Sequence, residues 1–374
     1  MSAAPTPTVA EIDLDALRHN VRVVRERAGD AALMGVVKAD AYGHGAVPVA
    51  RALVAAGVGR LAVATVPEGA ALRAAGIDAP LLVFAAPLPG FLPAYVRHGL
   101  EVTVPSLEAA EAVVRTAQEA GPLRVHVKVD TGMGRIGVPP AEAEAVVRRL
   151  ERAPGVTLTG LWTHFATADE PGSAFPAEQL RRFEPVLRTV AEAFEHIHVA
   201  NSGALFAVPE STEPLGARAL ARAGIALYGL LDLPAAREQL HPMMRLVSRV
   251  MHVKTVEPGT TISYGRRWRA ERRTRIATIG AGYADGYRRL LSNRAEIGLG
   301  GRRYPVAGTV CMDMFMVDLG PPEGPGGAVA VGDEAVLFGQ GGPSAFEVAA
   351  WAETITYEVT CGVSARVPRV YLGA

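Results

Sequence analysis

Over residues 1–236, short apolar runs alternate with longer segments rich in alanine, glutamate and arginine that repeat with a helical period. Helices placed between strands at this spacing return the chain so that successive strands run parallel. Eight such units predict an α/β fold with an N-terminal (β/α)8 TIM-type barrel. A doubly wound open sheet is the alternative, but no Gly-x-Gly-x-x-Gly sequence follows the first run. The runs are Gly35–Lys38, Leu61–Ala64, Leu81–Phe84, Val102–Val104, Val125–Val129, Leu158–Trp162, Ile197–Ala200 and the segment around Ile225–Tyr228.

The composition changes near residues 232–234, where short β-branched runs between Gly/Pro turns replace the alternation. We therefore expect two domains, the barrel over residues 1–236 and a mostly β C-terminal domain over residues 237–374. A strand at Glu11–Leu14 is a candidate to pack with the second domain, and Asp15 is placed to cap a helix at Ala16–Arg27. The second domain should contain strands at Leu246–Val256, Arg275–Ile279, Tyr304–Val310, Phe315–Leu319 and Glu334–Phe338 and a helix near Phe346–Thr354.

Charge and composition exclude several classes of function. The chain has 374 residues, with 38 basic and 38 acidic side chains and a formal net charge of zero. It has no basic stripe with interleaved aromatic residues, so we expect no nucleic-acid partner. The N-terminus has no signal sequence, no apolar stretch of membrane-spanning length follows, and the two cysteines have no paired spacing. We expect a cytoplasmic protein with no membrane partner, and His196-x-His198 is too weak a pattern to predict a metal site.

Lysine is rare in this chain, which draws attention to Lys38. Only Lys38, Lys128 and Lys254 are lysines, and the other 35 basic residues are arginines. A lysine amine can lose its proton near neutral pH and attack a carbonyl, whereas a guanidinium cannot. Because Lys38 ends an apolar run before a glycine-rich turn, it is a candidate Schiff-base lysine. A lysine that snorkels from the end of the strand is the alternative.

Active sites of such barrels lie where the strands end. Asn201-Ser202-Gly203 follows a strand and opens a helix, and Gly224-Ile225 offers further N–H groups, so an anion such as phosphate can bind there. A helix cap and a packing glycine are the alternatives. A phosphate site combined with a lone amine suggests pyridoxal phosphate. The polar residues that close the runs are Lys38, Tyr42, Lys128, Asp130, Arg135, His164, Asn201, Ser202 and Arg222.

The sequence of Val36–Gly45, Val-Val-Lys-Ala-Asp-Ala-Tyr-Gly-His-Gly, resembles the cofactor-lysine signature of alanine racemases. The resemblance extends over both expected domains, in the order of the family. It implies a pyridoxal 5'-phosphate-dependent isomerase that interconverts L-alanine and D-alanine and supplies D-alanine for cell-wall peptidoglycan. The further matching segments are Val127–Gly137, Thr163–Ala166, Ala200–Ser202, Arg222–Gly229, Ser263–Gly265, Gly282–Gly286, Val310–Asp313 and Arg366–Arg369.

The resemblance also implies how the cofactor is held. Lys38 would bind its aldehyde carbon, and Arg222, backed by His164, would face the pyridine nitrogen. A guanidinium keeps its proton, so that nitrogen would stay unprotonated and the ring would be a weak electron sink. The phosphate would lie against a tyrosine, a serine and two backbone N–H groups. The implied cofactor-binding residues are Lys38, Tyr42, His164, Asn201, Ser202, Arg222, Gly224, Ile225 and Tyr357.

Racemisation requires a base on each face of the α-carbon, and the resemblance assigns these roles to Lys38 and Tyr264. In the family the tyrosine comes from the partner subunit, which implies a homodimer whose active sites are shared across the interface. Lys128 matches a lysine that is often carbamylated, and an ion pair with Asp130 is the alternative. The implied substrate-binding residues are Arg135, Tyr283, Met312 and Asp313, and Tyr283 and Tyr357 resemble an aromatic gate that admits a methyl side chain.

Three departures from the family pattern affect details of the pocket. Ala223 stands where members commonly have proline, and Phe84 and Trp162 are bulky residues at strand ends. Three other functions share parts of this plan: a broad-specificity or serine racemase, a decarboxylase of basic amino acids, and a non-catalytic carrier of pyridoxal phosphate. Such carriers consist of the barrel alone, so the second domain with Tyr264 argues against that function.

Overall fold

The computed structural model describes residues 6–373, which form two compact units. The first contains the described residues up to Ala16, Tyr42–His44 and the chain from Pro242 onward; we call it the β unit. The second contains Leu17–Ala41 and Gly45–His241; we call it the barrel unit. The division at residues 236 and 237 into domains with separate roles stays a prediction.

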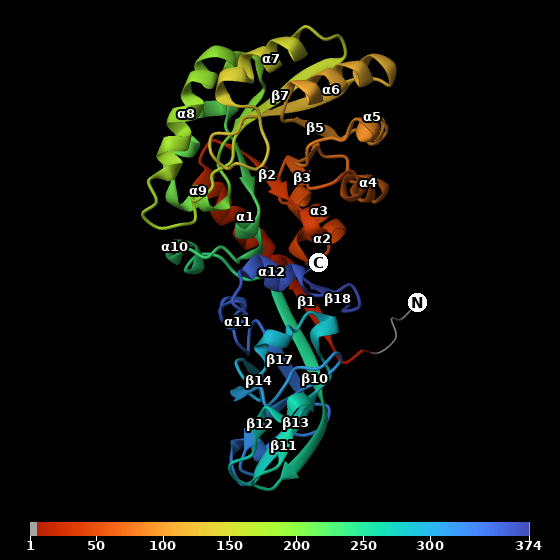
Figure 1. The fold of residues 1–374 in the computed structure, drawn as a ribbon, viewed down its shortest axis with the longest axis vertical. Helices are drawn as coiled ribbons and strands as arrows, with labels where there is room; N and C mark the ends of the chain where they lie inside the picture. Colours follow the sequence, from red (N-terminus) through yellow and green to blue (C-terminus); the bar gives the residue numbers. More distant parts are fainter. Residues whose placement is uncertain (1–5, 374) are drawn as a thin grey trace. The chain divides into compact units, whose positions relative to one another are not determined.

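The barrel unit is built on eight parallel strands, which confirms the predicted (β/α)8 barrel (Figure 1). The strands pair in the order β8-β7-β6-β5-β4-β3-β2-β9, and a bridge between Ile197 and Ala219 joins the two ends of this order, so the barrel is nearly closed. The strands are β2 (Ala32–Val36), β3 (Arg60–Val63), β4 (Leu81–Val83), β5 (Glu101–Val104), β6 (Leu123–Lys128), β7 (Val156–Trp162), β8 (His196–His198) and β9 (Leu220–Ala223).

Helices follow the strands around the outside of the barrel, and from α3 to α8 each packs against the next (Figure 1). In α6, the buried Ala110, Val113, Val114 and Ala117 recur at a spacing of three and four residues, so one face of the helix covers the strands. The helices of this unit are α1 (Leu14–Ala28, whose first turn belongs to the β unit), α3 (Ala46–Ala55), α4 (Val66–Ala74), α5 (Leu92–His98), α6 (Leu107–Glu119), α7 (Ala143–Glu151), α8 (Phe175–Val190), α9 (Ser202–Ala207) and α10 (Pro234–Arg237).

Among the eight predicted strands, the first and the last differ most from the structure. The first, predicted at Gly35–Lys38, is β2 and ends at Val36. The prediction of the last strand around Ile225–Tyr228 is wrong, because that apolar run forms a buried 3-10 turn. Gly229, with a φ of 72°, ends this turn. The strand is instead Leu220–Ala223, whose short Leu-Ala-Arg-Ala sequence contains a buried arginine and lacks β-branched residues.

The β unit is mostly β, as predicted, and its main sheet is antiparallel except where β1 lies parallel to β18. The strand β1 (Val9–Asp13) pairs with both β10 and β18, so the start of the chain belongs to this sheet. The other strands are β10 (Met244–Val256), β11 (Thr261–Ile262), β12 (Trp268–Arg269), β13 (Thr274–Ile279), β14 (Glu296–Leu299), β15 (Arg302–Pro305), β16 (Phe315–Gly320), β17 (Glu334–Phe338) and β18 (Arg369–Leu372), with helices α11 (Ala345–Trp351) and α12 (Thr356–Cys361).

Two local predictions in this unit are corrected. The strand expected at Tyr304–Val310 ends at Pro305, since the chain then turns at Gly308, which has a φ of 89°. The cap expected from Asp15 comes from Asp13, whose carboxylate accepts the N–H groups of Asp15 (2.8 Å) and Ala16 (3.0 Å). A carboxylate is favourable at this position because it pairs with the exposed N–H groups of the first helical turn. Within residues 6–373, no helix has both the length and the apolar surface needed to span a membrane.

Candidate active site

Lys38 lies two residues beyond the end of β2 and begins a left-handed turn, labelled α2 (Lys38–Tyr42) in Figure 1. Four successive non-glycine residues have positive φ: Ala39 (51°), Asp40 (52°), Ala41 (53°) and Tyr42 (54°). Each such residue costs roughly 1–2 kcal/mol relative to the right-handed conformation. Four in succession therefore require surrounding contacts that hold them, a form of strain that is concentrated at functional sites.

Two carboxylates hold this turn. Glu68 Oε1 accepts the Ala39 N–H at 2.7 Å, while Oε2 accepts the N–H groups of Ala64 (2.7 Å) and Thr65 (3.0 Å). One side chain of α4 thus joins the loops that follow β2 and β3. Asp40 Oδ1 accepts the Ala46 N–H at 2.7 Å, at the start of α3. These contacts fix the backbone from which Lys38 projects.

Arg222 lies within β9 and is 3% exposed. Its guanidinium donates to the carbonyl oxygens of Thr163 (2.9 Å) and Val199 (3.0 Å) and to Nδ1 of His164 (3.1 Å). Burial, and secondarily the charge of Arg135, lowers the pKa of Arg222 to about 9. The guanidinium therefore stays protonated at neutral pH, and the expected contact between His164 and Arg222 is present.

His164 follows β7 among several cations. Burial, together with the charges of Arg222, Arg135, Lys128 and Lys38, lowers the pKa of His164 well below its usual range, so its imidazole is neutral at neutral pH. Because Nδ1 accepts from Arg222, the ring proton is on Nε2. These four basic side chains come from the ends of β2, β6 and β9 and the loop after β6, so basic groups gather around the neutral imidazole of His164 at this end of the barrel.

Lys128 ends β6 and is 1% exposed. Its Nζ donates to the carbonyl oxygen of Val129 at 2.8 Å and lies 5.1 Å from the centroid of the Trp162 ring. Burial, and then the charge of Arg222, lowers the pKa of Lys128 to about 7, so much of the amine is neutral at neutral pH. The carboxylate of Asp130, the alternative ion-pair partner, accepts backbone N–H groups of its own loop, including that of Gly132 at 3.0 Å.

Ser202 connects the loops that follow β8 and β9. Its Oγ accepts the N–H groups of Gly224 (2.9 Å) and Ala226 (3.3 Å), and all three residues are buried. Asn201 Oδ1 accepts the Ala204 N–H at 3.0 Å, which is the helix cap that the sequence left open as an alternative. Ile225 is buried between Gly224 and Ala226. The Gly224 N–H, expected to contact a phosphate, instead supports Ser202 in this structure, and the Ser202 hydroxyl keeps its own proton to donate to a phosphate at the junction of these two loops.

Tyr42 and Tyr357 both belong to the β unit. Their ring centroids are 5.9 Å apart with the planes tilted by 52°, and burial raises the pKa of the Tyr42 phenol. Gly43 follows with a φ of 84°, and a Cβ atom there would lie 2.1 Å from the carbonyl oxygen of Thr360. Only glycine permits this close approach of the two segments, and it places Tyr42 beside α12.

Tyr264, Tyr283 and Met312 lie on connected loops of the β unit. The Thr309 hydroxyl donates to the carbonyl oxygen of Tyr264 (2.8 Å), and the Tyr283 N–H donates to that of Cys311 (3.0 Å), next to Met312. The three predicted side chains are 73%, 43% and 53% exposed. Large apolar side chains with this exposure, grouped on neighbouring loops, are typical of an interaction surface.

Asp313 is held from the same unit. Its carboxylate accepts from Arg366 at 2.9 Å, and that guanidinium also bonds both oxygens of the buried Asp285 (2.6 and 2.9 Å). The matching Arg366–Arg369 segment of the sequence thus supports the loop that carries Asp313.

Several residues that shape this site were not identified from the sequence. Gln179 of α8 donates to the His164 carbonyl oxygen and accepts the Ala166 N–H, both at 2.9 Å, so it fixes the loop that carries His164. Glu68 holds the left-handed turn, and Glu101 and His126 lie inside the barrel. The sequence does contain a signal for Glu101 and His126. Strands of a parallel barrel are normally apolar throughout, so a charged or polar residue beside or within such a run is unusual.

The barrel unit carries an amine, a buried guanidinium and a neutral imidazole at its strand ends, and the chain continues into a mostly β unit. This is the plan expected of the barrel-type amino-acid racemases that the sequence resembles. The family of alanine racemase N-terminal domains matches residues 12–232, and that of alanine racemase C-terminal domains matches residues 243–371. The chain belongs to the alanine racemase family, and it is an enzyme of that kind.

Individual relatives agree over nearly the whole chain. The alanine racemase of Symbiobacterium thermophilum is 46% identical, over 98% of this chain and 97% of its own. The alanine racemase of Chlorobaculum tepidum is 44% identical, over 99% of this chain and 97% of its own. Among solved structures, alanine racemase from Streptomyces coelicolor is 42% identical with a TM-score of 0.90, covering 98% of both chains.

Proposed function

We propose that this enzyme binds pyridoxal 5'-phosphate in the barrel and interconverts L-alanine and D-alanine, with Lys38 and Tyr264 as bases on opposite faces of the α-carbon. The barrel, residues 1–236, would hold the cofactor, and residues 237–374 would supply the second base and substrate contacts. The active form would be a homodimer with shared sites, and the product D-alanine would serve cytoplasmic synthesis of peptidoglycan. A solved alanine racemase from Bacillus anthracis with bound L-Ala-P, 35% identical with a TM-score of 0.89, supports an alanine-like substrate.

The residues present fit pyridoxal phosphate, and this fit carries the proposal. The Lys38 amine suits an aldehyde, and the Ser202 hydroxyl, which accepts two backbone N–H groups and can donate its own proton, suits a phosphate. Arg222 suits a pyridine nitrogen that carries no proton, because its guanidinium remains protonated and can only donate. These three kinds of group correspond to the three polar parts of one cofactor, and all are at barrel strand ends.

When bound, pyridoxal phosphate supplies a carbonyl carbon for the substrate amine and a conjugated ring that accepts electron density from the α-carbon. Lys38 Nζ would take or return a proton at one face of that carbon, and the Tyr264 hydroxyl at the other. Arg222 would withhold a proton from the nitrogen it faces, which limits how far electron density leaves the α-carbon and so favours return of a proton there. Arg135 would bind the substrate carboxylate, with the Met312 N–H and Asp313 from the partner subunit beside it.

Incubation of the purified protein, loaded with pyridoxal phosphate, with L-alanine in D₂O tests this function. We expect D-alanine to accumulate until its concentration equals that of L-alanine, because enantiomers have equal free energies. Each new D-alanine molecule should carry deuterium at Cα. Chiral chromatography with mass detection measures both quantities. A protein that binds the cofactor and forms no D-alanine would contradict the proposal, and conversion of serine at the same rate would favour a broad-specificity racemase.

A further inference from the structure

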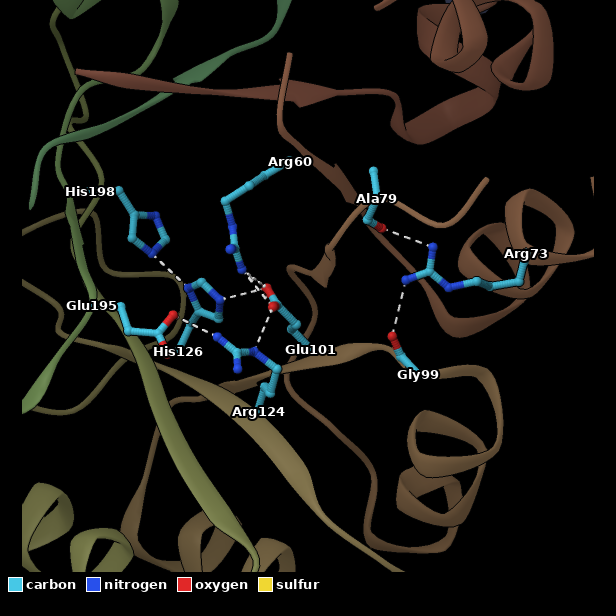
Figure 2. Close-up of polar contacts among 9 residues, drawn as sticks. All are labelled: Arg60, Arg73, Ala79, Gly99, Glu101, Arg124, His126, Glu195 and His198. Atoms are coloured by element: carbon cyan, nitrogen blue, oxygen red, sulfur yellow. Dashed lines mark hydrogen bonds and ion pairs between the residues drawn. The ribbon is translucent and has the colours of Figure 1, made fainter. Parts of the chain in front are cut away.

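A continuous chain of hydrogen bonds runs through the barrel interior from Glu101 to Arg222; we call it the interior chain. His126 Nε2 lies 2.9 Å from Glu101 Oε2, and His126 Nδ1 lies 2.9 Å from His198 Nε2. His198 Nδ1 in turn lies 3.2 Å from Arg222 Nη1. All four side chains are at most 3% exposed. Figure 2 shows the Glu101 carboxylate and His126 side by side, with His198 beyond them.

Glu101 begins the interior chain as an anion. Arg60 donates to both of its oxygens, and Arg124 donates to Oε1 at 3.2 Å (Figure 2). Burial alone would raise the pKa of Glu101, but the contacts with His126 and Arg60 outweigh burial and lower it to about 2. The carboxylate is therefore ionised at neutral pH and can only accept hydrogen bonds.

This anion, which can only accept, and Arg222, which can only donate, require the same donor direction from the two ends of the interior chain. Burial lowers the pKa of His126 and of His198, so both rings are neutral at neutral pH, with one donor and one acceptor nitrogen each. His126 must donate from Nε2 to the carboxylate, which leaves its Nδ1 as an acceptor. His198 must then donate from Nε2 to His126, which leaves its own Nδ1 to accept from Arg222.

The residues around His126 and His198 leave room for their two rings to meet, but not for a side chain at residue 160. Gly160 of β7 is in register with His126, and a Cβ atom at Gly160 would lie 2.1 Å from His126 Nδ1 and 2.7 Å from His198 Nε2. Trp162 stacks on His198 with ring centroids 5.4 Å apart and planes 7° apart. The Arg222 guanidinium also lies 5.0 Å from the Trp162 ring centroid. The lack of a side chain at residue 160 therefore serves the bond between the two imidazoles.

We propose that Glu101 is a positioning residue for the active-site arginine: through His126 and His198 it sets the donor direction that leaves His198 Nδ1 free to accept from Arg222. Glu101 itself touches no reacting group. This role goes beyond the proposed function. It rests on that function in one respect, that Arg222 faces the cofactor. Removing the anion, without removing any volume, should reverse the interior chain and place two donors against each other at Arg222.

The substitution Glu101→Gln removes the negative charge and keeps the size of the side chain. Its amide has one accepting oxygen and one donating NH₂ group, while three donors, from Arg60, Arg124 and His126, converge on the site. Orienting the NH₂ group toward two guanidinium groups is the costlier choice, so we expect it to face His126. His126 would then carry its proton on Nδ1 and His198 would carry its proton on Nδ1, opposite the Arg222 N–H.

The test uses the full-length protein with pyridoxal phosphate bound and ¹⁵N-labelled histidine. Nitrogen NMR should show the Nε2–H tautomer for His126 and His198 in the wild type and the Nδ1–H tautomer in Glu101→Gln. Steady-state kinetics should show a fall in kcat of about tenfold, with a smaller change in KM, because a displaced Arg222 affects the reacting complex more than substrate binding. Glu195→Gln is the matched control, since Glu195 is an exposed partner of the same Arg124 and should change neither quantity.

Gly160→Ala is the second variant, because it separates the two imidazoles without altering a titratable group. It should lower kcat by a similar factor while His126 keeps the Nε2–H tautomer. Wild-type tautomers in Glu101→Gln, or a wild-type kcat in both variants, would overturn the proposal. A wild-type protein with Nε2–H tautomers that does not racemise alanine would support the donor direction while contradicting the proposed function, so the two failures are distinguishable.

Discussion

Lys128 illustrates how the barrel changes the chemistry of a single residue. Arg222 and Arg135 lie close enough to contribute to the lowered pKa of its amine, which is about 7 in the folded protein. The residue is also one of only three lysines, in a chain that otherwise uses arginine. A neutral amine reacts with carbon dioxide to form a carbamate, and the resulting anion would offset the surrounding positive charge and help to orient Arg135.

We expect Lys128 to be carbamylated in the wild type. Because only the neutral amine reacts, and the neutral fraction rises as the pH passes through about 7, the carbamylated fraction should rise between about pH 6 and pH 8. Carbon NMR in the presence of ¹³C-bicarbonate measures it as one resonance that Lys128→Gln removes. Lys254→Gln, on the exposed edge of the β unit, is the control and should keep the signal. A spectrum without that resonance would show that Lys128 is a plain amine.

Among the structural elements, the left-handed turn α2 depends most on contacts from elsewhere in the chain. Ala39, Asp40 and Ala41 have no intrinsic preference for positive φ, so the conformation is maintained by Glu68, Asp40 and the backbone bonds around them. Glu68→Ala removes the acceptor of three backbone N–H groups. The free energy of unfolding should fall by about 1–3 kcal/mol, the range for losing hydrogen bonds to a charged acceptor.

The same variant should weaken the binding of pyridoxal phosphate about tenfold, because the turn that carries Lys38 loses its support. Urea denaturation and cofactor titration measure the two effects separately. Glu144→Ala removes an exposed partner of Arg148 and is the control; it should change stability by less than about 0.5 kcal/mol. A Glu68→Ala variant as stable as this control, with unchanged cofactor affinity, would show that the turn does not need the carboxylate.

The elements that the sequence predicts well are those specified locally. The barrel follows from the alternation of apolar runs and helical segments. In α6, for example, both the apolar spacing and the Ser106 cap lie in the segment itself. The last strand could not be predicted in this way. Arg222 is stable inside β9 only because carbonyl oxygens of Thr163 and Val199, from other strand ends, accept its hydrogen bonds.

The site shows the same division between local and long-range information. Lys38, Arg222 and Ser202 could be proposed from strand ends and from the resemblance to a family, since those signals lie in short segments. The left-handed turn could not, because local preference opposes it and Glu68 is 29 residues away from Ala39. The interior chain could not either, since it joins Glu101 and His126 from neighbouring strands with His198, which lies 72 residues after His126, and with Arg222 of β9.

At the scale of the whole molecule, the proposal requires a second copy of the chain. Tyr264, Tyr283 and Met312 are exposed within one described chain, and a partner subunit would give them their surroundings. Mixed dimers of a Lys38→Ala chain and a Tyr264→Phe chain test this requirement. If each site combines Lys38 of one chain with Tyr264 of the other, a mixed dimer keeps one intact site, because both substitutions fall in the other site.

Refolding the two inactive variants together should therefore restore about one quarter of the wild-type activity, since about half of the dimers are mixed and each has one of two sites intact. Each variant refolded alone is the control and should remain inactive. Activity that stays at the level of these controls in a mixture shown to contain mixed dimers would place both bases within one chain.

The central claim is that Lys38 and Tyr264 act on opposite faces of the α-carbon. The most direct test is α-hydrogen exchange in D₂O with Tyr264→Phe loaded with pyridoxal phosphate, measured separately from pure L-alanine and pure D-alanine. We expect one enantiomer to gain deuterium at Cα through the remaining base, the other to exchange at least about a hundredfold more slowly, and racemisation to be lost to the same extent. Exchange of both enantiomers at similar rates in this variant would contradict the account.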